Sequence, residues 1–256
     1  MSFLKNLTKE NLEQTRDQVG GFKVHDSDMY PGKIQHAFLA QWGSGAHYVN
    51  LSVKLDNGSI YSENITITNA NGENFWERDG KKHPLPGFTI LDDIALCTAG
   101  VSAAELDEPE EKVVNVYDKD AGAQVPKAVP MLMQLVGADI TLGIIKKIET
   151  VMDKNQATGK YDIPTDKERE SNFIDKVFHN PSNLTTVEAR NGKEEAAFYE
   201  EWLKANKSKV RDARKKGSTG TAGAPVRPGA PRAAAPGAPA AGAAPAQKKP
   251  LFGNKG

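Results

Sequence analysis

The sequence has a single cysteine, Cys97, among 256 residues. One cysteine excludes an intrachain disulfide and a cysteine-based zinc site. The five histidines, at 25, 36, 47, 83 and 179, lack the short spacings of metal ligands. No apolar run reaches the roughly 20 residues of a membrane-spanning helix, and the first residues do not resemble a signal peptide. We therefore expect a soluble intracellular protein with no metal, no cofactor and no membrane contact.

Recognisable catalytic motifs are also missing. Neither Gly43-Ser-Gly45 nor Gly80-Lys-Lys82 has the spacing of a phosphate-binding loop or a dinucleotide fingerprint. Asp92-Asp93 and Asp118-Lys-Asp120 are the acidic pairs that a magnesium-dependent nuclease would use, but adjacent acids on a loop are usually only solvated. The sequence therefore favours a protein that is not an enzyme, with a nuclease as an alternative.

The formal net charge of the chain is zero, but acidic and basic residues are strongly segregated along the sequence. From Lys204 onward the chain has twelve basic residues and one acid, Asp212, whereas residues 1–203 have 21 basic and 32 acidic residues. After Gly217 the chain is rich in Gly, Ala and Pro, a composition that cannot bury enough apolar surface to fold. The chain ends on an apolar pair between cations, which predicts a peptide that docks on a partner protein. The residues of this predicted docking tail are Lys248, Lys249, Leu251, Phe252 and Lys255.

Alternating side chains predict three consecutive strands, over residues 33–42, 47–55 and 60–68. In the second strand Val49, Leu51, Val53 and Leu55 share one face, and Tyr48, Asn50, Ser52 and Lys54 share the other. Asn57-Gly58 between the second and third strands is typical of a tight hairpin turn. The three strands are therefore expected to form an antiparallel meander.

The remaining pattern predicts helices, strands and polar loops. Helices are expected over residues 4–19, 89–99, 127–136 and 192–216, strands over 113–117, 140–151 and 172–179, and polar loops over 105–111 and 153–170. Three strands, a helical insertion and further strands match a mainly β chain built on a five-stranded oligonucleotide-binding (OB) barrel, with helices between strands 3 and 4. The predicted domains are a helical arm (1–21), the barrel (22–190), a C-terminal helix (191–216) and a flexible basic tail (217–256).

The segment 65–88 contains the strongest functional signal. Phe75 and Trp76 precede four cationic or aromatic side chains and a stiff Pro84-Leu85-Pro86-Gly87. Unpaired nucleic acid needs rings on which bases stack and cations that follow the phosphates. The alternative is that the two aromatics fill a core and the cations form a solvated turn. Since OB barrels bind over strands 2 and 3, the predicted site is Tyr48, Lys54, Phe75, Trp76, Arg78, Lys81, Lys82, His83, Lys146 and Lys147.

Four short motifs give the chain a resemblance to a known family. They are residues 3–12 (FLKNLTKENL), 72–76 (GENFW), 82–88 (KHPLPGF) and the end of the Gly/Ala/Pro tail, 249–253 (KPLFG). Together they resemble the single-stranded DNA-binding proteins of tailed bacteriophages. The resemblance implies an OB barrel that coats single strands during phage DNA replication, recombination and repair in the host cytoplasm. It also implies that Phe75, Trp76, Lys81, Lys82 and His83 belong to a characteristic loop.

The tail departs from the pattern of many single-strand binding proteins, because it is basic where theirs is acidic. Our leading hypothesis is a sequence-tolerant single-stranded DNA-binding protein. The alternative is an adaptor whose basic tail recruits a replication, recombination or RNA polymerase protein while the barrel only positions it.

Overall fold

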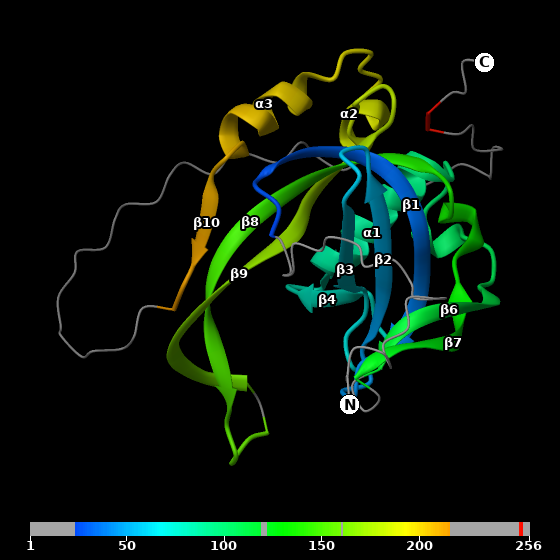
Figure 1. Cartoon of the computed structure of the whole chain (residues 1–256). Helices are drawn as coiled ribbons and strands as arrows, with labels where there is room; N and C mark the ends of the chain where they lie inside the picture. The colour runs from blue at the N-terminus through cyan, green and yellow to red at the C-terminus, as the bar shows by residue number, and fades with distance from the viewer. Residues whose placement is uncertain (1–23, 119–121, 160, 216–250, 253–256) are drawn as a thin grey trace, which may run out of the picture.

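The computed structural model describes residues 24–118, 122–159, 161–215 and 251–252, and the chain is mainly β with a few short helices (Figure 1). The strands are β1 (Asp28–Gln41), β2 (His47–Leu55), β3 (Ile60–Thr66), β4 (Phe75–Arg78), β5 (Lys81–Pro84), β6 (Glu110–Asp118), β7 (Ala123–Met131), β8 (Asp139–Lys154), β9 (Tyr161–His179) and β10 (Val210–Ala213). The helices are α1 (Pro86–Thr98), α2 (Thr186–Arg190) and α3 (Ala197–Asn206), with single 3-10 turns at Ala103–Glu105 and Met133–Leu135. The helix predicted over 4–19 lies outside the described residues.

Eight of the strands form one sheet. Its main path runs β10-β8-β1-β2-β3, with β9 paired to β8 and with β7 paired to both β1 and β6. All these pairs are antiparallel except β10 with β8. Figure 1 shows the β8–β9 ribbon and the β6–β7 hairpin extending on opposite sides of the central β1-β2-β3 meander. Strands β4 and β5 form a separate two-stranded sheet.

The predicted meander is confirmed, and its first strand is longer than expected. Asn57 Oδ1 accepts a hydrogen bond from the Ser59 amide at 3.0 Å, which closes the β2–β3 turn. Strand β1 begins at Asp28 and passes through Pro31-Gly32, where the sequence predicted a boundary. A side chain at Gly32 would come within 2.5 Å of the Lys54 carbonyl oxygen. Glycine at this position therefore serves close strand packing and does not end the strand.

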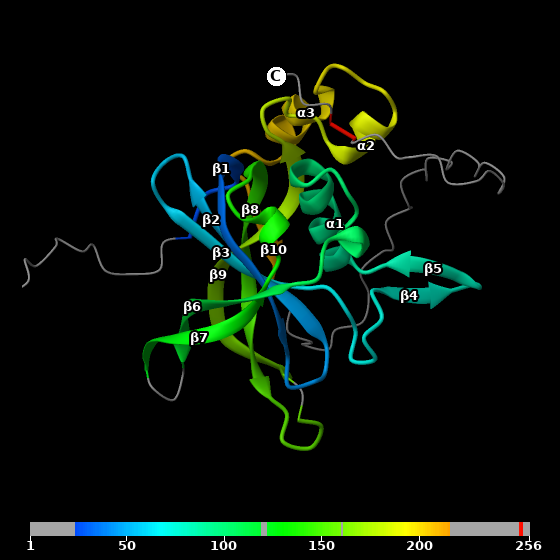
Figure 2. The same ribbon diagram turned by 90° about the vertical axis from the view of Figure 1, so that its right-hand side faces the viewer.

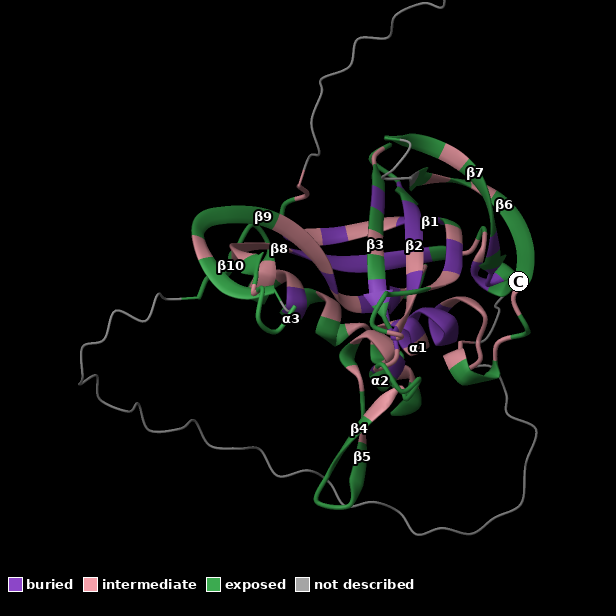
Figure 3. Cartoon of the chain, turned by 90° about the horizontal axis from the view of Figure 1, so that it is seen from below, coloured by how far each residue is buried: buried purple, intermediate pink, exposed green. Residues whose placement is uncertain are grey.

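The main core lies between the sheet and α1. Its buried side chains come from β1, β2, β3, α1, β8 and β9, and on α1 they include Leu91, Ile94 and Ala95. The helix predicted over 89–99 is confirmed, and it starts earlier, with Pro86 in its first turn, where a missing N–H costs little. Figure 3 shows the buried residues concentrated along the central strands and α1.

Strand pairing does not close the sheet into a barrel. In the described part of the chain β3 and β9 form no ladder, and a side chain connects them instead. Glu63 Oε2 on β3 accepts a hydrogen bond from the Ile174 amide of β9 at 2.9 Å and another from the Tyr61 hydroxyl at 2.7 Å. Burial raises the pKa of Glu63, although these two hydrogen bonds and nearby Lys147 oppose the rise.

Glu63→Gln should change how stability depends on pH. Because the folded-state pKa of Glu63 is raised, the native protein holds this proton to higher pH than the unfolded chain does, and stability falls as pH rises through the folded pKa. The Glu63→Gln variant should lack this contribution, since an amide oxygen can accept both hydrogen bonds without ionising. Urea unfolding between pH 4 and pH 8 should therefore show the wild type losing stability relative to the variant as pH rises, by about 1.4 kcal/mol per unit of pKa difference.

Glu108→Gln, which removes an exposed carboxyl from the loop before β6, is the matched control and should not reproduce the change seen with Glu63→Gln. A stability difference between the wild type and Glu63→Gln that stays flat with pH would contradict the assignment.

The helix predicted over 127–136 is wrong. The segment forms β7 and the 3-10 turn Met133–Leu135. Pro126 and Pro130 disfavour a helix, and Val129 and Met131 alternate with exposed neighbours to pack against Phe38 of β1. Its partner β6 extends the short strand predicted over 113–117 and takes up the end of the predicted loop 105–111.

The polar loop predicted over 153–170 is largely strand. Strands β8 and β9 continue through it as a long ribbon whose turn lies between Lys154 and Tyr161. Ion pairs link the two strands of the ribbon. Arg169 of β9 forms one with Glu149 of β8 at 2.7 Å, and Lys146 of β8 forms another with Glu170 of β9 at 2.9 Å. The sequence pattern missed it because cross-strand ion pairs, and not an apolar face, line this part of the ribbon.

The helix predicted over 192–216 is also too long. It runs only from Ala197 to Asn206, and Ser208 then takes a left-handed conformation with φ 58°. The chain continues as β10, parallel to β8. Trp202 anchors α3 in a small second core with Phe178 and Ile145, and its indole N–H donates to Asp175 at 2.8 Å. The apolar side of α3 therefore packs against β8 and β9 through Trp202.

Candidate nucleic-acid interface

The segment 75–84 forms a tight hairpin of β4 and β5. The register pairs Trp76 with His83 and Arg78 with Lys81. The two turn residues, Asp79 and Gly80, have φ of 53° and 69°. Positive φ at both positions is typical of the two-residue turns that match strand twist, and Asp-Gly is a favoured pair for them. The sequence analysis treated this segment as a loop, although the Asp79-Gly80 dipeptide indicates a hairpin turn.

The hairpin divides its side chains between two faces, because strand residues alternate. Trp76, Arg78, Lys81 and His83 share one face, which we call the Trp76 face. The Trp76 and His83 rings stack with centroids 4.5 Å apart and planes 23° apart. On the other face, the Lys82 ammonium lies 4.0 Å from the Phe75 ring centroid. The hairpin therefore combines aromatic rings with cations on both faces.

The Trp76 face remains accessible. Trp76 is 45% exposed even though His83 stacks on it. The Arg78 guanidinium lies 3.5 Å from the Asp79 carboxylate, a solvent-exposed contact of little strength. Within the described residues Lys81 makes no ion pair. The alternative that Phe75 and Trp76 fill a core does not fit these positions, since the hairpin projects away from the large sheet (Figure 2).

A second aromatic pair lies where β1 meets β2. The Trp42 and Tyr48 rings stack with centroids 4.1 Å apart and planes 26° apart. Trp42 is 39% exposed, and its indole N–H donates to Thr66 Oγ1 of β3 at 3.0 Å. The prediction included Tyr48 but missed Trp42. The signal was the Gly43–Gly45 turn, which folds the chain after β1 back onto β2, so that Trp42 lies opposite Ala46 and diagonal to Tyr48.

Polar side chains continue along the outer face of the same strands. His36 lies 3.1 Å from Asn50 Oδ1, and the Asn50 amide donates to Asn64 Oδ1 at 2.6 Å. Lys54 is exposed further along β2, opposite Lys33 of β1 and Ile60 of β3. This face, with Trp42 and Tyr48 at one end and Lys54 at the other, is the outer-sheet face.

The predicted site residues are therefore divided among different elements. Tyr48 and Lys54 lie on the outer-sheet face, and Phe75 to His83 lie on the hairpin, which leaves the molecule on the opposite side from β6–β7 (Figures 2 and 3). Lys146 and Lys147 lie on β8, where they pair with Glu170 at 2.9 Å and with Glu149 at 2.8 Å. Because these carboxylates balance both lysines, the predicted cations that remain available to phosphates are those of the hairpin and Lys54.

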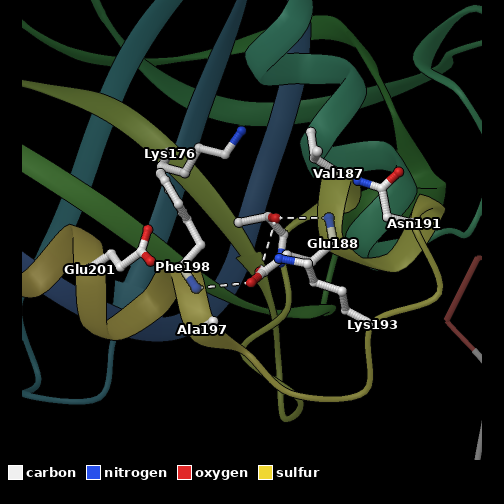
Figure 4. Close-up of a pocket in the computed structure, with 9 residues that line it drawn as sticks. Lys176, Val187, Glu188, Asn191, Lys193, Ala197, Phe198 and Glu201 are labelled. Atoms are coloured by element: carbon white, nitrogen blue, oxygen red, sulfur yellow. Dashed lines mark hydrogen bonds between the residues drawn. The ribbon is translucent and has the colours of Figure 1, made fainter. Parts of the chain in front are cut away.

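The pocket drawn in Figure 4 has a structural explanation. It lies between α2, α3 and Lys176 of β9. Glu188 in its wall accepts hydrogen bonds from the Thr185 amide at 3.0 Å and from the Phe198 amide at 2.8 Å. The carboxylate thus caps α2 and fastens α3 to it, which accounts for its place in the wall.

The acidic pair at 92–93 also has structural partners. Asp92 Oδ1 accepts hydrogen bonds from the Ser102 hydroxyl at 2.6 Å and from the Ala103 amide at 2.9 Å. Asp93 is buried and lies 3.3 Å from the Lys176 ammonium. Asp120, from the other predicted pair, lies outside the described residues. Within the described chain, no three His, Cys, Asp or Glu side chains gather as metal ligands would.

No family model matches the chain, and no curated protein matches it. No helix within residues 24–118, 122–159, 161–215 or 251–252 has the length and apolar character needed to cross a bilayer.

Proposed function

We propose that this chain is a non-enzymatic protein that binds single-stranded DNA with little sequence preference. The observation that carries the proposal is the Trp76 face, on which an exposed indole, an imidazole and two cations share one side of the β4–β5 hairpin. Bases stack on aromatic rings with about 1 to 3 kcal/mol each, and every base has a ring face to offer. Arg78 and Lys81 supply the charge that the phosphates require.

An OB-type architecture is part of the proposal, and the order of elements supports it. An antiparallel meander, β1 to β3, precedes α1, and β8 then returns antiparallel to β1 with β9 beside it. In OB folds the second and third strands and their loops bind oligonucleotides. The outer-sheet face has the matching position, so Trp42 and Tyr48 would form a second stacking platform.

The resemblance to phage proteins extends the proposal to a biological role. The protein would coat and protect single strands during phage DNA replication, recombination and repair in the host cytoplasm. The tail would add phosphate contacts or engage a replication or transcription protein. An adaptor that works through its tail alone would not need the exposed rings of the hairpin.

Intrinsic tryptophan fluorescence tests the proposal. Trp202 is buried, whereas Trp42 and Trp76 are exposed, so a ligand that stacks should quench the exposed pair. We expect oligo-dT to quench more strongly than duplex DNA, both in the full chain and in a chain ending at Lys215. The logarithm of the affinity should fall with the logarithm of salt concentration, by about 0.7 per phosphate neutralised.

Three results would contradict the proposal. Equal quenching by duplex and single strand would indicate a nonspecific polycation. Loss of binding on removal of residues 216–256 would move the site to the tail. Degradation of the oligonucleotide with magnesium present would indicate the nuclease alternative.

A further inference from the structure

The chain has a pocket at the opposite end of α1 from the β4–β5 hairpin. Its walls are the C-terminal end of α1, the turn after β9 and the side of α2 that faces them. On one side the lining includes Leu96, Ala99 and Gly100, and on the other Pro181, Leu184 and Ala189. The α2 side is a hollow of about 670 Å³ and the α1 side an adjoining hollow of about 160 Å³, and both His179 and Phe252 line the two of them.

Two residues from the end of the chain lie in this region and form part of the pocket wall. Leu251 and Phe252 both line it, and both are partly buried. The Phe252 ring stacks on His179 with centroids 4.0 Å apart and planes only 5° apart, and it packs against the main core. The apolar pair that the sequence predicted to be a docking element therefore rests on its own body.

The receiving side of the pocket is held in place by the body itself. His179 Nδ1 lies 2.7 Å from the Ser182 hydroxyl, and the His179 backbone bonds to Leu184 and Asn183 at 2.9 and 2.7 Å. These contacts fix the ring that Phe252 meets. Burial also lowers the pKa of His179, which favours the neutral imidazole as a stacking partner.

We propose that this pocket is a peptide-binding site whose occupant is the Leu251-Phe252 pair of the same chain. While the pair is seated, it is unavailable to any other protein, so a partner that takes the tail must displace it from the body. This inference does not depend on DNA binding. It assigns the end of the tail a receptor at α1 and β9, away from both stacking surfaces.

Chain length permits binding within one molecule. Thirty-five residues, 216–250, separate the last described residue of the body from Leu251. At about 3.3 Å per residue a chain of that length can span on the order of 100 Å, far more than one domain requires. A tethered ligand has an effective concentration of about millimolar, so even a weak apolar contact is largely occupied.

Peptide competition tests the inference. A fluorescein-labelled peptide of residues 246–256 is titrated into the full-length wild type and into full-length Phe252→Ala, with binding followed by anisotropy. We expect the peptide to bind the Phe252→Ala variant at least about fivefold more tightly, because in the wild type a tethered copy already covers the His179 ring. The same peptide with alanine in place of its phenylalanine should bind neither protein. Gln247→Ala, which keeps the apolar pair and the cations beside it, should behave as the wild type.

A second measurement reports on the pocket directly. The His179 imidazole resonances should shift between wild type and Phe252→Ala, because a stacked ring imposes a ring-current shift, whereas Gln247→Ala should leave them unchanged. Equal peptide affinity for the two proteins, or unchanged His179 resonances, would overturn the proposal. A His179 shift that disappears on dilution of the wild type would also overturn it, since a second copy would then supply the tail.

Discussion

Replacing Trp76 by alanine should weaken binding of single-stranded DNA by about 5- to 150-fold. The range follows from the loss of one stacked base, about 1 to 3 kcal/mol, with 1.4 kcal/mol per tenfold change. The fold should be retained, because Trp76 is 45% exposed and lies in a two-stranded sheet outside the main one. Anisotropy of labelled oligo-dT measures the affinity, and circular dichroism verifies the fold.

Tyr161→Ala is the matched control for this variant. Tyr161 is an aromatic residue that is 70% exposed at the start of β9, on the ribbon remote from the hairpin. Its removal should leave affinity within about twofold. Equal losses for the two variants would mean that any exposed ring contributes and that the hairpin has no special role. If Trp76→Ala bound single-stranded DNA as tightly as the wild type, the proposed role of the Trp76 face would be wrong.

Gly87→Ala should destabilise the whole domain by about 3 kcal/mol or more, beyond the usual cost of overpacking. Gly87 lies in the first turn of α1, against β3. An added methyl group would collide with the backbone carbonyl of Thr66, which has no side-chain freedom with which to yield. For a domain of this size, 3 kcal/mol corresponds to a fall in Tm of about 6 to 12 °C, measurable by thermal unfolding.

Gly43→Ala is the control for the glycine variant. Gly43 lies in the turn between β1 and β2, has nothing within 4 Å of an added methyl group and does not need a positive φ. Its Tm should change by no more than about 2 °C, since surface substitutions usually stay within about 0.5 kcal/mol. Similar Tm values for the two alanine variants would show that α1 can move away from β3 without cost.

The close approach at Gly87 also connects the fold to the candidate site. The Leu85 amide donates to the Asn74 carbonyl at 2.9 Å, which closes the base of the β4–β5 hairpin immediately before α1. A helix packed tightly on β3 therefore sets where the hairpin leaves the body. A partly destabilised Gly87→Ala protein should consequently bind single strands less well even where it remains folded.

Local patterns in the sequence determined the elements with strong periodicity. Alternation over residues 47–55 and the Asn57-Gly58 turn predicted β2 and its hairpin, and the spacing of Ile90, Ile94 and Leu96 predicted α1. These predictions succeed because side-chain period and turn chemistry act over a few residues. The apolar pair Leu251-Phe252 was likewise singled out by its composition alone, although the composition could not say on which surface it would rest.

Features that depend on partners distant in the sequence could not be predicted from local patterns. Residues 127–131 form a strand because their backbone pairs with β6 and because Val129 and Met131 pack against Phe38 of β1. The charged β8–β9 ribbon is held by a backbone ladder between residues far apart in sequence, and the Arg169–Glu149 pair across it joins residues twenty positions apart. Two ring-stacking contacts, Trp42 on Tyr48 and Phe252 on His179, also join separate segments of the chain. Local sequence determines which conformation a segment prefers, but burial and pairing energies come from residues that only the fold brings together.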